Sequence, residues 1–420
     1  YVGGGTSYEQ SKDSYKDANR WGNLLMSAIW ERDLSDKRKM TSTYYVTDGY
    51  YHALRENISE FTIRDKAYKE YSLESNISSV LDIGAKIDFS DKSFGRHDLN
   101  YGASVVYHLF SPIAFTHDYM ENKEKGRYDE EEATAGRNYH SPELAIYAED
   151  EFAISPYIYL NAGLRYMLFI TKNKAYNTVE PRFALSYNPS RKLSLKLAYS
   201  EMSQPVHQLE SFKTESPGSF WMPATANMEP IHARLASAET EWRPNRHFLL
   251  DFACFWKTMD HLYEYTGNHI LPSPAAWENE FTEGKGRSYG FEFYGEYQNE
   301  RWEISTAYTL SWSQRYFEAF YHDWYRDRYD NRHNIVINGI YKAHQLIDMY
   351  VTWTLRSGNR YTIPLYGDQY YQGESLYPNN FQMPTYHRLD AGINFRARTA
   401  KKGRDYIVTF AVYNLYGRKN

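Results

Sequence analysis

The sequence predicts an all-β fold, a large antiparallel transmembrane β-barrel, and three observations support this. Apolar and polar residues alternate with a period of two along many stretches, the pattern of strands with one wet and one apolar face. Short polar turns alternate with long connecting segments, as in bacterial outer-membrane barrels. Aromatic residues make up 17% of the chain, including 42 tyrosines, although 24% of residues are charged. A barrel with aromatic girdles and a polar interior needs this unusual combination.

About sixteen strands are predicted, and many of them are longer than the five or six residues typical of globular proteins. A tilted strand crosses a membrane with about 9–11 residues, so these strands are long enough to cross and project beyond it. They are expected near residues 20–33, 37–48, 76–90, 96–111, 140–155, 157–171, 178–188, 191–202, 232–243, 246–263, 286–299, 301–315, 333–343, 346–357, 384–398 and 404–417.

The connections between these strands predict which end of the barrel faces which compartment. Short turns rich in Asn, Pro, Ser, Asp and Gly are the connections expected on the periplasmic side. The first expected strand runs into such a turn, at 33–37. Long loops are expected at the opposite end, at residues 49–75, 112–139, 203–231, 264–285, 316–332 and 358–383. Closure of the sheet is required, because lipid cannot satisfy an unpaired strand edge.

The alternation also assigns side chains to the two faces of the sheet. The residues expected to face lipid include Leu195, Phe293 and Val351. The residues expected to face the lumen include Glu292, Glu296, Asp348 and Asp390. A soluble β-sandwich shows the same alternation, so this pattern alone leaves that alternative open. The length of the strands favours the barrel.

Composition excludes several other classes of protein. No run of 18 or more apolar residues is present, so no transmembrane helix is predicted. The net charge of −5 gives no electrostatic argument for nucleic-acid binding. Cys254 is the one cysteine, so neither a disulfide framework nor a cysteine metal site is predicted. The chain starts at Tyr1 without a signal-peptide pattern, so the signal peptide of an exported protein would have been removed or would lie outside these residues.

The last two expected strands carry a recognisable sequence motif. The stretch from Met383 to Asp390 reads M-P-T-Y-H-R-L-D, and the stretch from Phe410 to Asn420 reads F-A-V-Y-N-L-Y-G-R-K-N. These stretches resemble the end of the barrel in TonB-dependent outer-membrane receptors, especially those of the Bacteroidetes type. Further resemblances are G-K-G-R-S-Y-G-F-E at 284–292, Y-D-N-R-H-N at 329–334, and V-E-P-R at 179–182 followed by Tyr199 and Ser200. Together these motifs cover roughly residues 140–420.

The resemblance implies an architecture larger than this chain. The family's barrel has about 22 strands, so residues 1–420 are expected to be a partial barrel domain. The N-terminal plug, about five first strands and the last strand are expected to be absent from it. Asn420 is then expected at the outer side, with one closing strand still to come.

The resemblance also implies a function, that of an active transporter in the bacterial cell outer membrane that binds a scarce nutrient at extracellular loops and imports it. The implied partners are the TonB-ExbB-ExbD complex, reached through the plug, and a small ligand such as a siderophore, haem, cobalamin or an oligosaccharide. Membrane lipid, lipopolysaccharide and a surface lipoprotein are further implied partners. No cofactor, metal or catalytic residue is expected. A passive porin without a plug and a soluble β-sandwich adhesin are the alternatives, and no nucleophile elbow supports an enzyme.

Aromatic residues in the long loops are the candidate ligand contacts, because exposed rings can stack on sugars, haem or aromatic siderophores. The alternative is that they pack the loops against one another. The candidates are Trp221, Trp277, Trp324, Tyr325, Tyr366 and Tyr370. The run from His322 to His333 contains two histidines and three aspartates, but its spacing matches no metal motif. Its interleaved arginines predict ion pairing instead.

Overall fold

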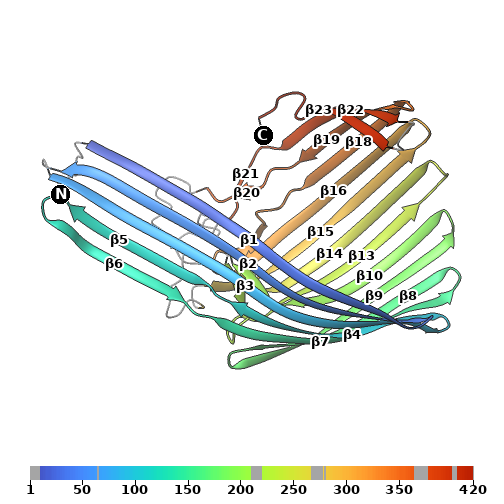
Figure 1. Cartoon of the computed structure of the whole chain (residues 1–420), viewed down its shortest axis with the longest axis horizontal. Helices are drawn as coiled ribbons and strands as arrows, with labels where there is room; N and C mark the ends of the chain where they lie inside the picture. Colours follow the sequence, from blue (N-terminus) through green and yellow to red (C-terminus); the bar gives the residue numbers. More distant parts are fainter. Residues whose placement is uncertain are drawn as a thin grey trace.

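The computed structural model describes residues 10–63, 66–209, 220–265, 278, 281–363, 377–399 and 404–419. Within these residues, 19 strands form one antiparallel sheet and four more strands form two small ribbons. The large sheet curls into an open trough (Figure 1). None of the described residues form a helix long and apolar enough to cross a membrane.

The main body of the sheet confirms the predicted strands. When β5, β6 and β17 are set aside, sixteen of the 19 strands follow one another as an antiparallel meander. They are β1 (Gln10–Ser35), β2 (Arg38–Ile63), β3 (Lys66–Phe94), β4 (His97–Phe110), β7 (Tyr139–Ser155), β8 (Ile158–Thr171), β9 (Lys174–Ser190), β10 (Leu193–Gln204), β13 (Ile231–Trp242), β14 (Phe248–Tyr265), β15 (Phe281–Gln298), β16 (Trp302–Phe317), β18 (His333–His344), β19 (Ile347–Arg356), β22 (Tyr386–Thr399) and β23 (Arg404–Val412). Among the described residues β1 pairs only with β2 and β23 only with β22, so the sheet is open between β1 and β23.

Short turns gather at one end of the trough, at the right in Figure 1, as the sequence predicts. The turn between β15 and β16 shows how polar residues form them. The side chain of Asn299 accepts hydrogen bonds from the backbone N–H groups of Arg301 and Trp302, at 2.8 Å and 2.7 Å. Gly95 has a φ of 72° between β3 and β4, a conformation that glycine adopts without strain. We call the opposite end of the barrel its mouth.

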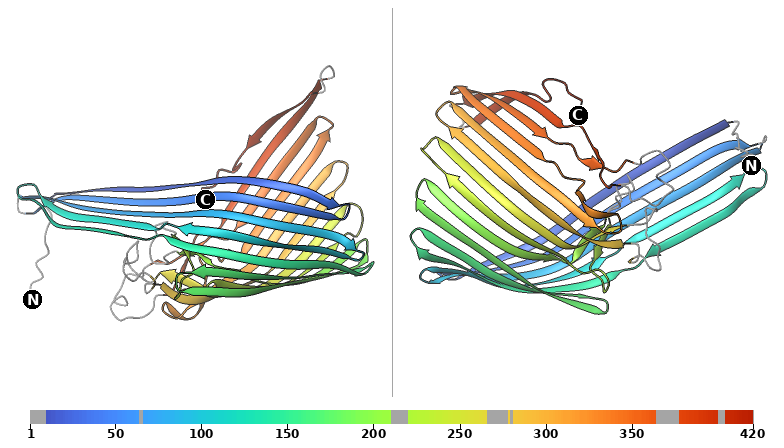
Figure 2. Two further views of the ribbon diagram at one scale, coloured as in Figure 1. Left: turned by 60° about the horizontal axis from the view of Figure 1, so that its bottom comes forward. Right: turned by 180° about the vertical axis from the view of Figure 1, so that it is seen from behind.

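Two of the predicted long loops are wrong, because residues 49–75 and 112–139 are largely strand. The pairing of β2 with β3 runs without interruption from Arg38 opposite Asp91 to Ile63 opposite Lys66. The hairpin of β5 (Ile113–Asn122) and β6 (Gly126–Gly136) adds to the first half of β3. Residues 10–22, 49–63, 66–80 and 113–136 thus form a blade that projects beyond the rest of the sheet (Figure 2).

The blade was missed because both of its faces carry polar side chains, so the alternation that marks a half-buried strand is weak there. Cross-strand side-chain contacts hold it together instead of a second layer. The rings of Tyr71 and Tyr119 stack with centroids 4.8 Å apart. The guanidinium of Arg127 lies 4.2 Å from the centre of the Tyr119 ring. These contacts stabilise a sheet exposed on both sides.

The register confirms the predicted faces, because directly opposed residues of paired strands share a face. One row joins Leu195 to Phe293 through Thr240 and Phe252. A row on the other face joins Glu296 to Asp390 through Ser305, Asn338 and Thr352. Glu143 and Arg315 share this second face and line one cavity although their strands are far apart in the sheet. The second face is therefore the concave, inward face.

Aromatic side chains form two bands on the outward face. Toward the mouth, Tyr289 stacks between Trp256 and Trp312, with ring centroids 4.9 Å and 5.4 Å away. Toward the short turns, Phe248 contacts Tyr297, and Trp302 contacts Tyr341, at 4.8 Å and 4.5 Å. The stretch from Tyr289 to Tyr297 covers about 20 Å of membrane normal once strand tilt is allowed for. The exposed residues between the bands are apolar, among them Phe252, Phe291, Met349 and Val351.

The closing hairpin explains the motif that β22 and its partner carry. The carboxylate of Asp390 accepts the backbone N–H of Asn414 at 2.9 Å and pairs with Arg388 at 2.8 Å. Beyond β23 the chain turns with Asn414 at a φ of 55° and Gly417 at 66°. Arg418 then donates to the carbonyl of Thr385 at 3.0 Å. Asp390, Asn414 and Arg418 of this motif thus join the end of β22 to the turn after β23.

Candidate functional site

Two segments fold from the mouth into the trough, and the first lies between β10 and β13. It includes the ribbon of β11 (Val206–Leu209) and β12 (Phe220–Pro223). Met222 and Met228 of this segment are buried against Phe110 and Tyr139 of the sheet. The hydroxyl of Tyr176 donates to the carbonyl of Thr225 at 2.5 Å. This segment therefore covers the inward face of β4, β7 and β9 near the mouth.

The second inward segment follows β16 and contains β17 (Tyr321–Arg326). Phe317, Phe320 and Tyr325 form a buried cluster with Leu262 of β14. Gly284 of β15 makes this packing possible, because a Cβ there would lie 2.4 Å from the Phe317 ring. The glycine-containing motif at the start of β15 thus allows large rings to lie across the strand.

A cavity of about 390 Å³ lies on the inward face, lined by residues of β7, β8, β10, β13, β14 and β16 and by Pro205 at the start of the first inward segment. Cavities of this size hold small molecules. One row of opposed residues crosses its wall, from Met202 through Ala233 and Met259 to Gly286 and Arg315. Apolar and charged side chains share the lining, which consists of Glu143, Arg165, Met167, Met202, Ser203, Gln204, Pro205, Ile231, Ala233, Lys257, Met259, Leu262 and Arg315.

Gly286 lets three of these side chains converge on the cavity. A Cβ at Gly286 would lie 2.7 Å from Cε of Met259, 2.9 Å from Cδ1 of Leu262 and 3.3 Å from a guanidinium nitrogen of Arg315. The three side chains occupy the space over the glycine. Any larger residue at this position would push them into the cavity.

Arg165 is neutralised by two carboxylates. Its guanidinium lies 2.9 Å from Glu143 and 3.0 Å from Glu180. Glu180 is 1% exposed, and its other oxygen accepts the backbone N–H of Ser203 at 2.9 Å. His108 extends this chain of contacts, because its ring lies 3.8 Å from Glu143 and 2.7 Å from Asp82. This charge-assisted network holds β3, β4, β7, β8, β9 and β10 together below the first inward segment.

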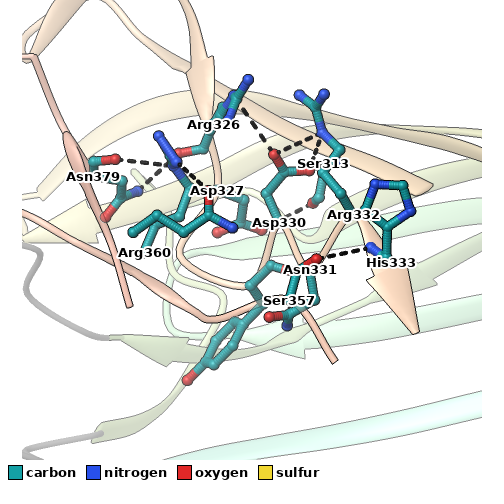
Figure 3. A network of polar contacts seen from close by, with 12 residues as sticks. Ser313, Arg326, Asp327, Asp330, Asn331, Arg332, His333, Ser357, Arg360 and Asn379 are labelled. Carbon is teal, nitrogen blue, oxygen red and sulfur yellow. Dashed lines mark hydrogen bonds and ion pairs between the residues drawn. The ribbon is translucent and has the colours of Figure 1, made fainter. Parts of the chain in front are cut away.

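Arg315 is neutralised by Asp327, and Asp327 belongs to the polar network that Figure 3 shows. Two guanidinium nitrogens of Arg315 lie 3.1 Å from one oxygen of Asp327. Asp330, which is buried, accepts the N–H of Ser313 at 2.9 Å and pairs with Arg332 at 3.2 Å. The motif around residue 330 therefore anchors the second inward segment to β16.

The same network reaches a third segment, which follows β19. The amide of Asn379 donates to the carbonyl of Arg326 at 2.9 Å, and Arg360 donates to the carbonyl of Asn379 at 3.1 Å. Arg360 lies in the ribbon of β20 (Arg360–Tyr361) and β21 (Phe381–Gln382). Burial lowers the pKa of Arg360 from its ordinary value. The network joins two loop segments of the mouth into one unit.

Lys257 differs from the two arginines of the cavity. No hydrogen bond or ion pair joins its ammonium to another side chain in the part of the chain that the structure describes. An ammonium in a partly apolar cavity is favourably placed when an anionic group contacts it. Lys257 is therefore the cation of this cavity most suited to an anionic group of a ligand.

The structure places three of the six predicted ligand contacts. Trp221 lies in β12, half-buried, and its backbone N–H donates to Ser78 at 3.0 Å. Trp324 lies in β17 with the guanidinium of Arg287 4.2 Å from its ring centre. Tyr325 is buried in the cluster with Phe317. The predicted contacts Trp277, Tyr366 and Tyr370 lie outside the described residues.

The sequence predicts ion pairs within the run that extends from His322 to His333, and this is confirmed. Asp330 pairs with Arg332 of the same run, and Asp327 pairs with Arg315 of β16. His322 pairs with Glu318 at 2.6 Å. Sequence reasoning missed Arg165, Lys257 and the methionines of the cavity. The alternation of residues predicts that they face inward. Which inward residues come together depends on how the sheet curls.

A curled antiparallel sheet with two outward aromatic girdles, an apolar band between them and a polar concave face is an outer-membrane β-barrel. The chain belongs to the TonB-dependent receptor-like β-barrel family, whose model matches residues 1–415. Proteins of this family are receptors and transporters of the Gram-negative outer membrane rather than enzymes, so the outer membrane is the location of this chain.

Solved structures show the same fold at low sequence identity. FpvA of P. aeruginosa bound to heterologous pyoverdines is 11% identical, with a TM-score of 0.58, and the match covers 97% of this chain and 63% of that one. The copper transporter OprC is 9% identical, with a TM-score of 0.59 and coverage of 95% and 66%. The ferric citrate transporter FecA is 11% identical, with a TM-score of 0.56 and coverage of 96% and 66%. The chain thus spans about two thirds of the length of these proteins. No curated protein sequence matches the chain.

Proposed function

We propose that the chain is the barrel of an active outer-membrane transporter that binds a scarce nutrient at the mouth and imports it to the periplasm. The observation that supports this is the inward cavity of about 390 Å³, which is lined by Lys257, whose ammonium pairs with no side chain among the described residues. A passive pore needs no binding cavity of this kind. Family membership supports nutrient transport as the general activity.

The proposal includes the energy source and the ligand class. Import is driven by the TonB-ExbB-ExbD complex acting through a plug domain encoded outside residues 1–420. The ligand is a small nutrient compound, such as a siderophore, haem, cobalamin or an oligosaccharide, and its body contacts Met202, Met259 and Leu262. Trp221 and Trp324 contact it at the rim. A surface lipoprotein and lipopolysaccharide are further proposed partners.

Transport is tested with the gene deleted from its host and restored on a plasmid. Growth is compared on media limited in turn for a siderophore-bound metal, haem, cobalamin and oligosaccharides, in strains with and without TonB. The expected result is one medium on which both deletions stop growth. Growth that depends on this gene but not on TonB would support the passive porin instead.

The cavity is tested in the same strains with Lys257→Gln. Lys196 is the matched control, because it is an inward lysine of β10, separated from the strand of Lys257 by β13, and does not line the cavity. Lys257→Gln is expected to slow uptake about tenfold, whereas Lys196→Gln leaves it unchanged. Equal uptake by both variants at equal barrel levels would remove the cavity from the proposal.

A further inference from the structure

A second hollow, of about 600 Å³, lies on the outward face across β2, β3, β4, β7 and β8. Two rows of opposed residues form it. One row begins with Tyr44 opposite Ala85, and the other ends with Ala103 opposite Ile146 and Ile146 opposite Tyr166. Ala85 and Ala103 have small side chains, so they leave space above the sheet at the floor of the hollow. The two tyrosines stand at opposite ends of the hollow.

The hollow lies within the lipid-facing band. On β4, Tyr101, Ala103, Val105 and Tyr107 alternate along the outward face. Tyr101 stacks on Phe89 at 5.2 Å on the side of the short turns, and the hydroxyl of Tyr107 lies 2.5 Å from His140 on the side of the mouth. These aromatic pairs belong to the two girdles, so the hollow between them is surrounded by hydrocarbon.

No charged group projects into the hollow from its described walls. Lys86 contributes to the lining, but its ammonium pairs with Asp88 at 3.0 Å and lies 5.6 Å from the ring centre of Tyr147, both on the inward face. The remaining walls are apolar apart from Ser42, Ser104 and the tyrosines. The hollow therefore suits a hydrocarbon chain and excludes a polar headgroup.

The end of the hollow at β2 indicates the leaflet from which the chain enters. Arg38, Met40, Ser42 and Tyr44 lie in line on the outward face, and Arg38 adjoins the short turn after β1. Arg38 pairs with Asp91 at 2.7 Å, but half of its side chain remains exposed. Its Nε contacts Asp91 and Ser93, and its terminal N–H groups, which make no hydrogen bond to a described residue, are placed for a phosphate at the periplasmic interface. The phosphate-bearing lipid of the periplasmic leaflet is a phospholipid.

We propose that this outward hollow, the β2–β8 groove, binds one acyl chain of a phospholipid whose phosphate contacts Arg38. The groove crosses four strand spacings, about 19 Å, which is long enough for an acyl chain that spans one leaflet, about 15 Å of a hydrocarbon core about 30 Å thick. The lipid fills a recess that the strands leave in the barrel wall. This inference rests on the barrel lying in the membrane and is independent of the ligand that the barrel carries.

The proposal is tested on the full-length protein, extracted in a mild detergent and examined by native mass spectrometry with analysis of the extracted lipid. Wild type is expected to retain one phospholipid. Ala103→Leu, which fills the floor, is expected to lower its occupancy at least fivefold, and Arg38→Gln is expected to lower it severalfold. Ala236→Leu is the control, because Ala236 lies on the outward face between Tyr199 and Trp256, outside the groove.

Three outcomes would overturn the proposal: phospholipid retained equally by all variants, lipid A found in place of phospholipid, or a second copy of the barrel found instead of lipid. Folding of each variant is checked by its heat-modifiable migration in gels. Should Ala103→Leu fail to fold, wild-type protein is labelled in membranes with a phospholipid that carries a photoreactive group in its acyl chain. Cross-links at Leu144 and Ile146 would support the groove, and cross-links spread evenly over the outward face would contradict it.

Discussion

Glu180 and Arg165 form a buried ion pair across β9 and β8, with the carboxylate 3.0 Å from the guanidinium. The Glu180 side chain is 2% exposed and that of Arg165 is 24% exposed. The pair is satisfied on both sides, because Glu180 also accepts a backbone N–H from Ser203 and Arg165 also contacts Glu143. Removal of one partner leaves the others desolvated without compensation.

Glu180→Ala is therefore expected to destabilise the barrel by about 3–5 kcal/mol. Glu180→Gln, which keeps a hydrogen-bond acceptor, should cost less. The measurement is urea-induced unfolding in lipid vesicles. Glu241→Gln is the control, because Glu241 pairs with Arg243 at 2.8 Å with both side chains substantially exposed, and such a pair contributes less than about 1 kcal/mol. Equal losses for Glu180→Ala and Glu241→Gln would refute the network.

Val351→Arg places a charge in the lipid-facing band and is expected to cost about 2–4 kcal/mol if the residue lies near the midplane. Val336→Arg is the matched change on the inward face, since Val336 lies opposite Ala307 and Thr354 there. Unfolding of both variants in vesicles tests the register. A larger loss for Val336→Arg than for Val351→Arg would mean that the two faces are exchanged.

Gly286→Leu is expected to displace Met259, Leu262 and Arg315 into the cavity and to reduce ligand uptake more than tenfold while the barrel still assembles. The displaced groups are flexible ends of side chains, so the strand itself can stay paired. Uptake and heat-modifiable migration are measured together. Gly339→Ala is the control, because its Cβ would lie 3.3 Å from Val351 on the outward face. Normal uptake by Gly286→Leu would show that the cavity wall around Gly286 is not needed for ligand binding.

Gly290→Ala is expected to harm assembly rather than uptake. A Cβ at Gly290 would lie 2.5 Å from the carbonyl oxygen of Leu310 and 3.0 Å from Cα of Ser311, and backbone of a paired strand cannot move aside. The amount of folded barrel in the outer membrane is the measurement. Wild-type levels of Gly290→Ala would show that β15 and β16 tolerate a wider separation.

Docking of the first inward segment is expected to weaken in acid because of His207 in β11. Burial lowers the pKa of His207 to about 4, with nearby His261 adding to the shift. Its ordinary pKa is about 6.5, so the released segment binds the proton more tightly than the docked one. Docking is then at full strength above pH 6.5 and loses about 3 kcal/mol as the pH falls to about 4.

Hydrogen exchange of the peptide from Phe220 to Glu229 at several pH values measures this effect. His207→Phe keeps an aromatic ring beside Tyr263, which contacts the imidazole edge-on at 5.1 Å. Because residue 207 no longer titrates in this variant, protection of the peptide against hydrogen exchange should be the same at pH 7 and pH 4.5. An equal pH dependence in both proteins would show that His207 is not its cause.

Much of the fold could be predicted because barrel strands carry a local signal. Leu195 and Phe293 were assigned to the lipid face from alternation alone, and the register places them there. The blade could not be predicted in this way, because Tyr71 and Tyr119 sit in strands that are wet on both faces and contact each other only through the pairing of β3 with β5. The candidate site was less predictable still. Of the aromatics proposed from loop composition, Tyr325 is buried in a packing cluster.

By itself the sequence determined the class of fold, the sixteen strands of the meander, the lipid-facing side of the strands that carry Leu195, Phe293 and Val351, and the family. These properties depend on residues near one another in the chain. Only the tertiary structure decided that Glu143, Lys257 and Arg315 line one cavity, that Asp327 pairs with Arg315 there, and that Ala85 and Ala103 open a groove toward lipid. These relationships arise when distant strands are brought together by the curl of the sheet, and period-two alternation carries no information about that curl.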